Sequence, residues 1–152
     1  MAGLTPAAPG KILAAKFLLY PALGVALAAL PAAVSQPAAL GRPFFWLTLL
    51  VAACGATGVG LTIAGLARTQ RAASLGVLGY LLAAALLLVV CRRGGLPGVA
   101  HLFLEYHSPR LLHAALEGTA GWSDWGELAG AAVLASAWAG LATWLFRRRG
   151  WQ

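Results

Sequence analysis

Residues 44–67 read FFWLTLLVAACGATGVGLTIAGLA and contain no Asp, Glu, Lys, Arg or His. A helix needs about 20 mainly apolar residues to cross the hydrocarbon core of a bilayer, which is about 30 Å thick. Because lipid offers no hydrogen-bond partner for backbone groups, a lone apolar stretch of this length is stable there as a helix. This stretch therefore predicts a transmembrane helix.

Three further apolar blocks lie at about residues 12–34, 74–91 and 128–146, and Lys16 is their only charged residue. The long side chain of Lys16 can reach the nearby membrane surface. Pro21 and Pro31 predict a kink or an early end in the first block. Mean hydropathy is +0.80, and only 10% of residues are charged, against about 25% in soluble domains. We expect one all-α membrane domain over residues 1–152, a polytopic integral membrane protein with four transmembrane helices.

The first block also resembles a cleaved signal peptide, because Lys11 and Lys16 precede an apolar run that small residues follow. Its apolar run is long for a signal peptide, and no clean A-x-A cleavage site is present. These two features favour a membrane span.

The basic residues form two sets at the ends of the apolar blocks. An even number of spans places both termini on one side, and cytoplasmic loops carry an excess of Lys and Arg. The side of the termini would hold Lys11, Lys16, Arg68, Arg71, Arg147, Arg148 and Arg149, and the other side Arg42, Arg92, Arg93 and Arg110. Tryptophans flank the apolar blocks as in an aromatic belt: Trp46, Trp122 and Trp125 at the outer border, Trp144 and Trp151 at the inner one. We expect a multi-pass protein of the cell membrane with both termini cytoplasmic.

Residues 92–127 form a long outer connection that holds all four acidic residues. Within it, Ser108 suits a helix N-cap, Pro109 the first helical position and Gly118 the C-terminal cap. The helix between them would be amphipathic, with Arg110, His113 and Glu117 on one face and Leu111, Leu112, Ala115 and Leu116 on the other. The pattern predicts a short helix lying in the outer membrane interface.

Little in the chain indicates catalysis or cofactor binding. His101 with Glu105, and His113 with Glu117, have the i, i+4 spacing of two metal ligands on a helix. No spacing fixes a third ligand, so local ion pairs are the better interpretation. A GxSxG elbow, a Walker A loop and a GxGxxG fingerprint are absent. The net charge is +7, but the basic residues lie at the ends of the apolar blocks rather than in a continuous stripe, which argues against nucleic-acid binding. We therefore expect no enzyme, metal or cofactor site.

Small residues mark places where helices can approach closely. The second span is rich in them, at Gly55, Gly58, Gly60 and Gly65, and the fourth opens with the GxxxG pair Gly126 and Gly130. Packing within the chain is the first interpretation, and a dimer seam is the alternative. None of the four blocks holds a carboxylate, the group that ion-driven carriers commonly place inside the membrane. Any transport energy is therefore expected to come from another source.

The order of features resembles the membrane domain of an ABC exporter permease of the type-two class, which includes the G-subfamily transporters. Ala15-Lys16-Phe17-Leu18 matches the start of the family's third helix, residues 60–73 its small-residue-rich fourth helix and inner loop, and Ser108-Pro109-Arg110 its amphipathic outer stretch. The basic tail at residues 146–151 matches the end of the sixth helix.

This resemblance implies the C-terminal four helices of a permease, since the chain starts where the third helix would begin. It implies alternating access driven by a separate ATP-binding subunit, a second permease half or a homodimer, and a bacterial inner membrane. Contact with the ATPase would lie at the cytoplasmic side, where the chain offers Lys11, Lys16, Arg68 and Arg71. The alternative is a stand-alone four-helix membrane protein with an accessory or scaffolding role.

Overall fold

The computed structural model describes residues 9–67, 69–93 and 97–149, and within these ranges every regular element is a helix. Four helices are long and apolar enough to cross a membrane: α1 (Pro9–Ser35), α2 (Pro43–Leu66), α3 (Gln70–Arg93) and α6 (Trp122–Arg149). The short elements are the 3-10 helix η1 (Pro37–Gly41), α4 (Pro97–Ala100) and α5 (Leu104–Glu117). The predicted all-α architecture with four spans is confirmed.

The four long helices match the predicted blocks to within about four residues at each end, except at the start of α6. α1 continues through Pro21 and Pro31 to Ser35, so the early end that these prolines could have caused does not occur. α6 begins at Trp122, six residues before the predicted start at Leu128. The earlier start has a local cause, because the Asp124 carboxylate accepts a hydrogen bond of 2.8 Å from the backbone N–H of Gly121 and caps the first turn.

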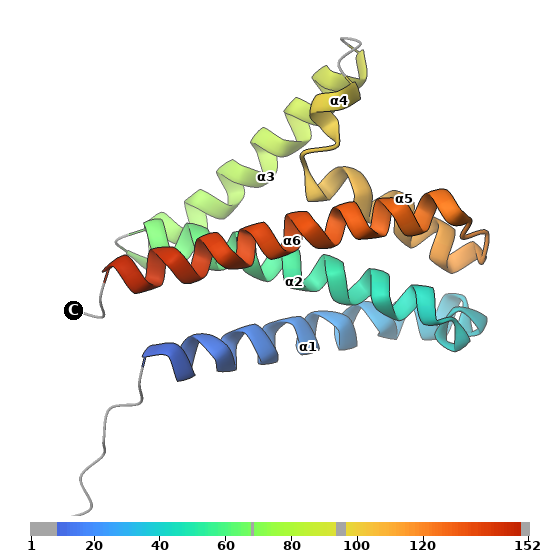
Figure 1. Cartoon of the computed structure of the whole chain (residues 1–152), viewed down its shortest axis with the longest axis horizontal. Coiled ribbons are helices and arrows are strands. Elements are labelled where there is room, and N and C mark those ends of the chain that lie inside the picture. Colours follow the sequence, from blue (N-terminus) through green and yellow to red (C-terminus); the bar gives the residue numbers. More distant parts are fainter. Residues whose placement is uncertain (1–8, 68, 94–96, 150–152) are drawn as a thin grey trace, which may run out of the picture.

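α2 is the central helix, and it packs on α1, α3, α5 and α6 (Figure 1). At Gly58, a Cβ atom would lie 3.0 Å from both the backbone nitrogen of Ala139 and the Cβ of Trp138. A glycine is therefore needed at this crossing of α2 and α6, as predicted for the small residues of the second span. The Thr62 hydroxyl, one turn on, donates to the Gly58 carbonyl over 2.8 Å and stays satisfied inside the apolar contact.

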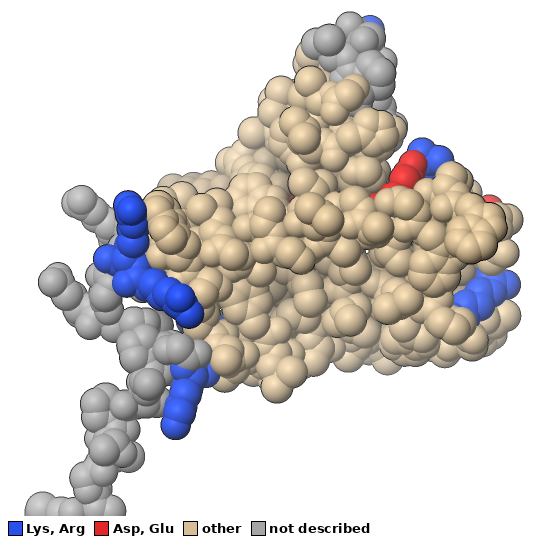
Figure 2. All heavy atoms as spheres, in the orientation of Figure 1, with Lys and Arg blue, Asp and Glu red and all other residues tan. Residues whose placement is uncertain are grey.

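The buried side chains form two clusters, one toward each end of the bundle. One contains Phe45 and Leu111, where α2 begins and α5 ends, and extends through Leu49 to Leu104 near the middle of α2. The other contains Leu13, Leu61 and Ala142, where α1 begins and both α2 and α6 end. Figure 2 shows Lys and Arg gathered at the two ends of the bundle, with uncharged surface between them on the face drawn. A charged end, an apolar middle and a second charged end are what a bilayer-spanning bundle requires.

The apolar surfaces of α1 and α3 are largely exposed. Leu18 of α1 is 77% exposed and Leu75 of α3 is 69% exposed. α3 meets α2 near its start, where Gly76 lies against Ile63, and then leans away, so that its C-terminal end and α4 stand clear of the other helices (Figure 1). Lipid or further protein must cover these surfaces.

Gly58→Leu and Gly60→Leu form a matched pair that tests the α2–α6 crossing. A side chain at Gly58 meets α6, whereas nothing lies within 4 Å of a Cβ at Gly60. Overpacking typically costs about 1–3 kcal/mol. Each substitution replaces one glycine inside α2, so the loss of a helix-interior glycine is common to both variants. We expect Gly58→Leu to lower the thermal unfolding midpoint in detergent and Gly60→Leu to leave it unchanged or raise it. Equal effects would contradict close packing at Gly58.

Candidate functional site

α5 lies along the central helix, in the opposite chain direction. Its first residue, Leu104, fills the space over Gly55, whereas Ala115 and Leu116 near its end lie at Arg42. The 13 residues from Arg42 to Gly55 correspond to about 20 Å of helix at 1.5 Å per residue. Gly55 is near the middle of Pro43–Leu66. The short helix predicted in the outer interface therefore has its C-terminal end at the end of the bundle, and its N-terminal end reaches the bundle middle.

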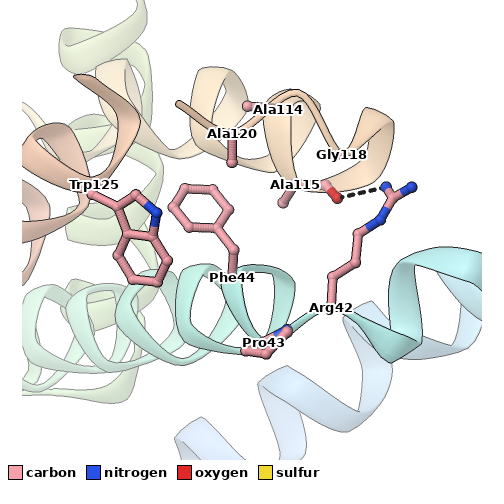
Figure 3. Close-up of a pocket in the computed structure, with 8 residues that line it drawn as sticks. All are labelled: Arg42, Pro43, Phe44, Ala114, Ala115, Gly118, Ala120 and Trp125. Carbon is pink, nitrogen blue, oxygen red and sulfur yellow. Dashed lines mark hydrogen bonds between the residues drawn. The ribbon is translucent and has the colours of Figure 1, made fainter. Parts of the chain in front are cut away.

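The C-terminal end of α5 is clamped by Arg42, which precedes α2. The Arg42 Nη1 donates to the backbone carbonyl of Ala115 over 3.2 Å (Figure 3). It also donates to the carbonyl of Leu116 over 2.6 Å. These carbonyls lack partners within the helix, and a cation there also interacts favourably with the helix dipole. Gly118 adopts φ 74°, and the guanidinium occupies the space that a Cβ would need there. The predicted glycine cap is thus confirmed.

A hollow of about 310 Å³ adjoins this clamp. The Phe44 and Trp125 rings form one side, in an edge-to-face contact with centroids 5.0 Å apart. Its remaining lining consists of Arg42, Pro43, Ala114, Ala115, Gly118 and Ala120 (Figure 3). Among the described residues of the lining, Arg42 alone is charged, and it already binds two carbonyls. The hollow therefore offers an apolar wall rather than groups for acid–base or nucleophilic chemistry.

The predicted start of the short helix is wrong. The helix begins at Leu104, so Ser108 does not cap it; the Ser108 hydroxyl donates back to the Leu104 carbonyl over 2.9 Å. Pro109 lies inside the helix rather than at its first position. The cause is burial of one face of the helix. Leu104, His107 and Leu111 are buried at helical spacing, so the helix begins before Ser108.

The predicted polar face of α5 divides between two contacts. Arg110 forms an ion pair of 2.6 Å with Glu127 of α6, and this pair ties the two helices together. His113 and Glu117 form a local i, i+4 contact of 3.3 Å, as predicted. Leu111 and Ala115 are buried on the opposite face, with Leu112 and Leu116 packed against the same cluster.

At the N-terminal end of α5, polar and aromatic side chains meet within the apolar bundle. The Tyr80 hydroxyl of α3 lies near the Glu105 carboxyl. The Tyr80 ring also contacts Trp138 of α6 edge to face, with centroids 6.1 Å apart. Tyr80 therefore joins α3 to both α5 and α6. The second oxygen of Glu105, Oε2, is buried and has no hydrogen-bond partner.

His107 is 5% exposed, and its Nε2 lies 3.0 Å from the His101 carbonyl oxygen. A carbonyl can only accept, so Nε2 donates this hydrogen bond, whereas Nδ1 is buried without a hydrogen-bond partner. His101 lies in the turn before α5, with its ring against Tyr106 and His107. The predicted helical pair of His101 and Glu105 is therefore not formed. Among the described residues, no group of three or more His, Cys, Asp or Glu is placed to hold a metal ion.

The basic residues predicted to contact an ATPase lie at the other end of the bundle. Lys11 and Lys16 flank Leu13, which packs near the ends of α2 and α6, and Arg71 is in the first turn of α3. Arg68 lies outside the described residues. Arg148 lies at the same end and stacks on Trp144, with 4.3 Å from its guanidinium carbon to the ring centroid. These cations therefore lie at one end of the bundle, and their contact with an ATPase stays a prediction.

Comparison of the chain with models of known families, with curated proteins and with solved structures finds no match. The function must therefore be argued from the residues and their geometry.

Arg42→Ala tests whether the clamp holds α5 in place. A hydrogen bond to a charged group typically contributes about 1.5–3 kcal/mol, whereas an exposed ion pair contributes about 0–1 kcal/mol. Arg110 is 53% exposed, so Arg110→Ala is the control. We expect Arg42→Ala to speed amide hydrogen exchange in the last turn of α5 and lower the unfolding midpoint more than Arg110→Ala does. Similar small effects in both variants would contradict the clamp.

Proposed function

We propose that this chain is a membrane-spanning permease portion of an ATP-driven exporter, working with a separate ATPase and a second membrane half. The observation that carries the proposal is α5, a helix between the third and fourth spans whose N-terminal end lies beside Gly55 in the middle of α2. A helix of this depth interrupts the lipid-facing bundle and brings polar groups to its centre. Such irregularity is tolerated inside membranes where it is buried in protein or lines a path.

The order of features supports the same proposal. The small-residue-rich helix followed by an inner basic loop, the outer Ser-Pro-Arg stretch and the basic tail resemble the C-terminal part of a type-two exporter permease. Lys11, Lys16 and Arg71 lie at the end of the bundle that the charge bias assigns to the cytoplasm. That end is where an ATPase subunit would bind.

The exposed surfaces of α1 and α3 support a second membrane half. α3 leans away from α2 and α6, and its C-terminal residue is Arg93. Helices of a second half, packed between α3 and the rest of the bundle, would shield this end of α3 from lipid.

Affinity purification of the tagged chain from its native membranes tests the proposal. We expect a Walker A ATPase to co-purify, and we expect the double charge reversal Lys16→Glu, Arg71→Glu to reduce its recovery, because both cations lie at the proposed contact. The control is the double variant Lys16→Arg, Arg71→Lys, which changes the same two positions and keeps both positive charges. Purification without any ATPase would reject the exporter proposal and favour the accessory role.

A further inference from the structure

A second hollow adjoins the one beside the Arg42 clamp. The first has a volume of about 310 Å³ (Figure 3) and the second one of about 150 Å³, and Ala120 and Trp125 belong to both linings. The second lining also contains Gly121 and Trp122. Small-molecule sites commonly have volumes of about 300–1,000 Å³, and the first hollow alone reaches this range. The two hollows together are therefore large enough for a small polar group and the start of an apolar chain.

Both hollows lie where the bundle meets the border of the membrane. Their linings include the first residues of α2 and of α6, two helices that can each cross a membrane. Trp122 is 94% exposed, and Trp125 is exposed as well. Tryptophans at the ends of spanning helices typically lie at the level of the lipid headgroups. The groups that reach the hollows from the membrane are therefore headgroups and the adjoining parts of acyl chains.

Arg42 has hydrogen-bond donors that the clamp does not use. A guanidinium carries five N–H groups. The clamp uses Nη1, and among the described residues no acceptor binds Nη2 or Nε, nor does any described carboxylate form an ion pair with Arg42. Two neighbouring N–H groups of an arginine match two oxygens of a phosphate. A phosphate can therefore bind Arg42 while the clamp on α5 stays in place.

Asp124 supplies a charge of the opposite sign beside the second hollow. Its carboxylate accepts a hydrogen bond of 2.8 Å from the N–H of Gly121, which lines that hollow. No described Lys, Arg or His forms an ion pair with Asp124. The two adjoining hollows thus have a cation without an acidic partner at the first and a carboxylate without a basic partner at the second.

We propose that the two hollows bind the headgroup of phosphatidylethanolamine, a phospholipid that carries one phosphate and one ammonium group. The phosphate binds Nη2 and Nε of Arg42, the ammonium donates to the Asp124 carboxylate, and the start of one acyl chain lies against Phe44 and Trp125. This headgroup matches both charges of the site. An anionic headgroup would bring a second negative charge beside Asp124, and a choline headgroup has no N–H to donate to it. The proposal does not depend on the exporter proposal.

Photo-crosslinking tests the site in the full chain reconstituted in phosphatidylcholine vesicles. Three lipids with phosphatidylethanolamine, phosphatidylglycerol or phosphatidylcholine headgroups are added in trace amounts, each with the same diazirine on the acyl chain close to the glycerol. Peptide mass spectrometry locates the label. We expect the phosphatidylethanolamine probe to label the residues that line the hollows several-fold more than the other two probes do. All three should label the exposed faces of α1 and α3 equally, which makes these faces an internal control.

Two variants form a matched pair for the same experiment. Ala120 lines both hollows, whereas its neighbour Thr119 belongs to neither lining. Ala120→Phe should fill the hollows and abolish the preferred label, and Thr119→Phe should keep it. Asp124→Asn, which keeps a capping side chain on α6, should remove the preference for phosphatidylethanolamine over the other two probes.

The comparison of the three probes on the wild-type chain gives a result without requiring that any variant fold. Stronger labelling by the phosphatidylglycerol probe would overturn the proposal in favour of an anionic lipid. Equal labelling of the hollows by all three probes, or no label there, would reject a specific headgroup site. A preference that survives Ala120→Phe in folded protein would show that the lipid binds elsewhere.

Discussion

Two glycines one turn apart on α2 determine how the helices of this protein come together. Gly58 lets α6 approach until the backbone of Ala139 lies against it, and Gly55 accepts the side chain of Leu104 from α5. Between helices in lipid, apolar burial supplies little net attraction, so close van der Waals packing at small residues must supply more of it. A larger residue at Gly58 would separate α2 from α6, and one at Gly55 would displace the N-terminal end of α5.

The polar centre of the molecule depends on this packing. With Leu104 seated on Gly55, the next residue, Glu105, faces Tyr80 of α3, and Tyr80 contacts Trp138 at the α2–α6 crossing. The Arg42 clamp fixes the other end of α5 to the loop before α2. α5 is thus held at both ends. The Arg42 side chain binds the carbonyls of its C-terminal end, and Leu104 at its N-terminal end packs on Gly55 near the middle of α2.

This arrangement changes one conclusion from the sequence: the four apolar blocks hold no carboxylate, but α5 brings one beside them. The absence of a carboxylate from the blocks therefore no longer argues against an ion gradient as an energy source, and the ATPase proposal rests on the resemblance and on the basic end.

The spans could be predicted because a long apolar block in lipid can satisfy its backbone hydrogen bonds by itself only as a helix. The cap at Gly118 could be predicted because the left-handed backbone that ends a helix favours glycine locally. The start of α5 could not. Ser108-Pro109 is a good local helix start, but burial of Leu104 and His107 against distant parts of the chain extends the helix beyond it. The Arg42 clamp joins residues 73 positions apart, and an arginine before a proline gives no local sign of such a partner. The depth of Glu105 was missed for the same reason, since it is set by α2 and α3 rather than by its own neighbours in sequence.

The depth of α5 is the claim on which the proposed function depends, and disulfide trapping in native membranes measures it most directly. Gly55→Cys and Leu104→Cys would be combined in a chain whose own Cys54 and Cys91 are replaced by Ser, with Gly60→Cys and Leu104→Cys as the control pair. Two cysteines can be bridged when their Cα atoms are about 4.4–6.8 Å apart. The structure predicts efficient intramolecular cross-linking of the 55–104 pair and little of the 60–104 pair. Failure of the 55–104 pair to cross-link while the protein remains folded would contradict the placement of α5 beside the middle of α2.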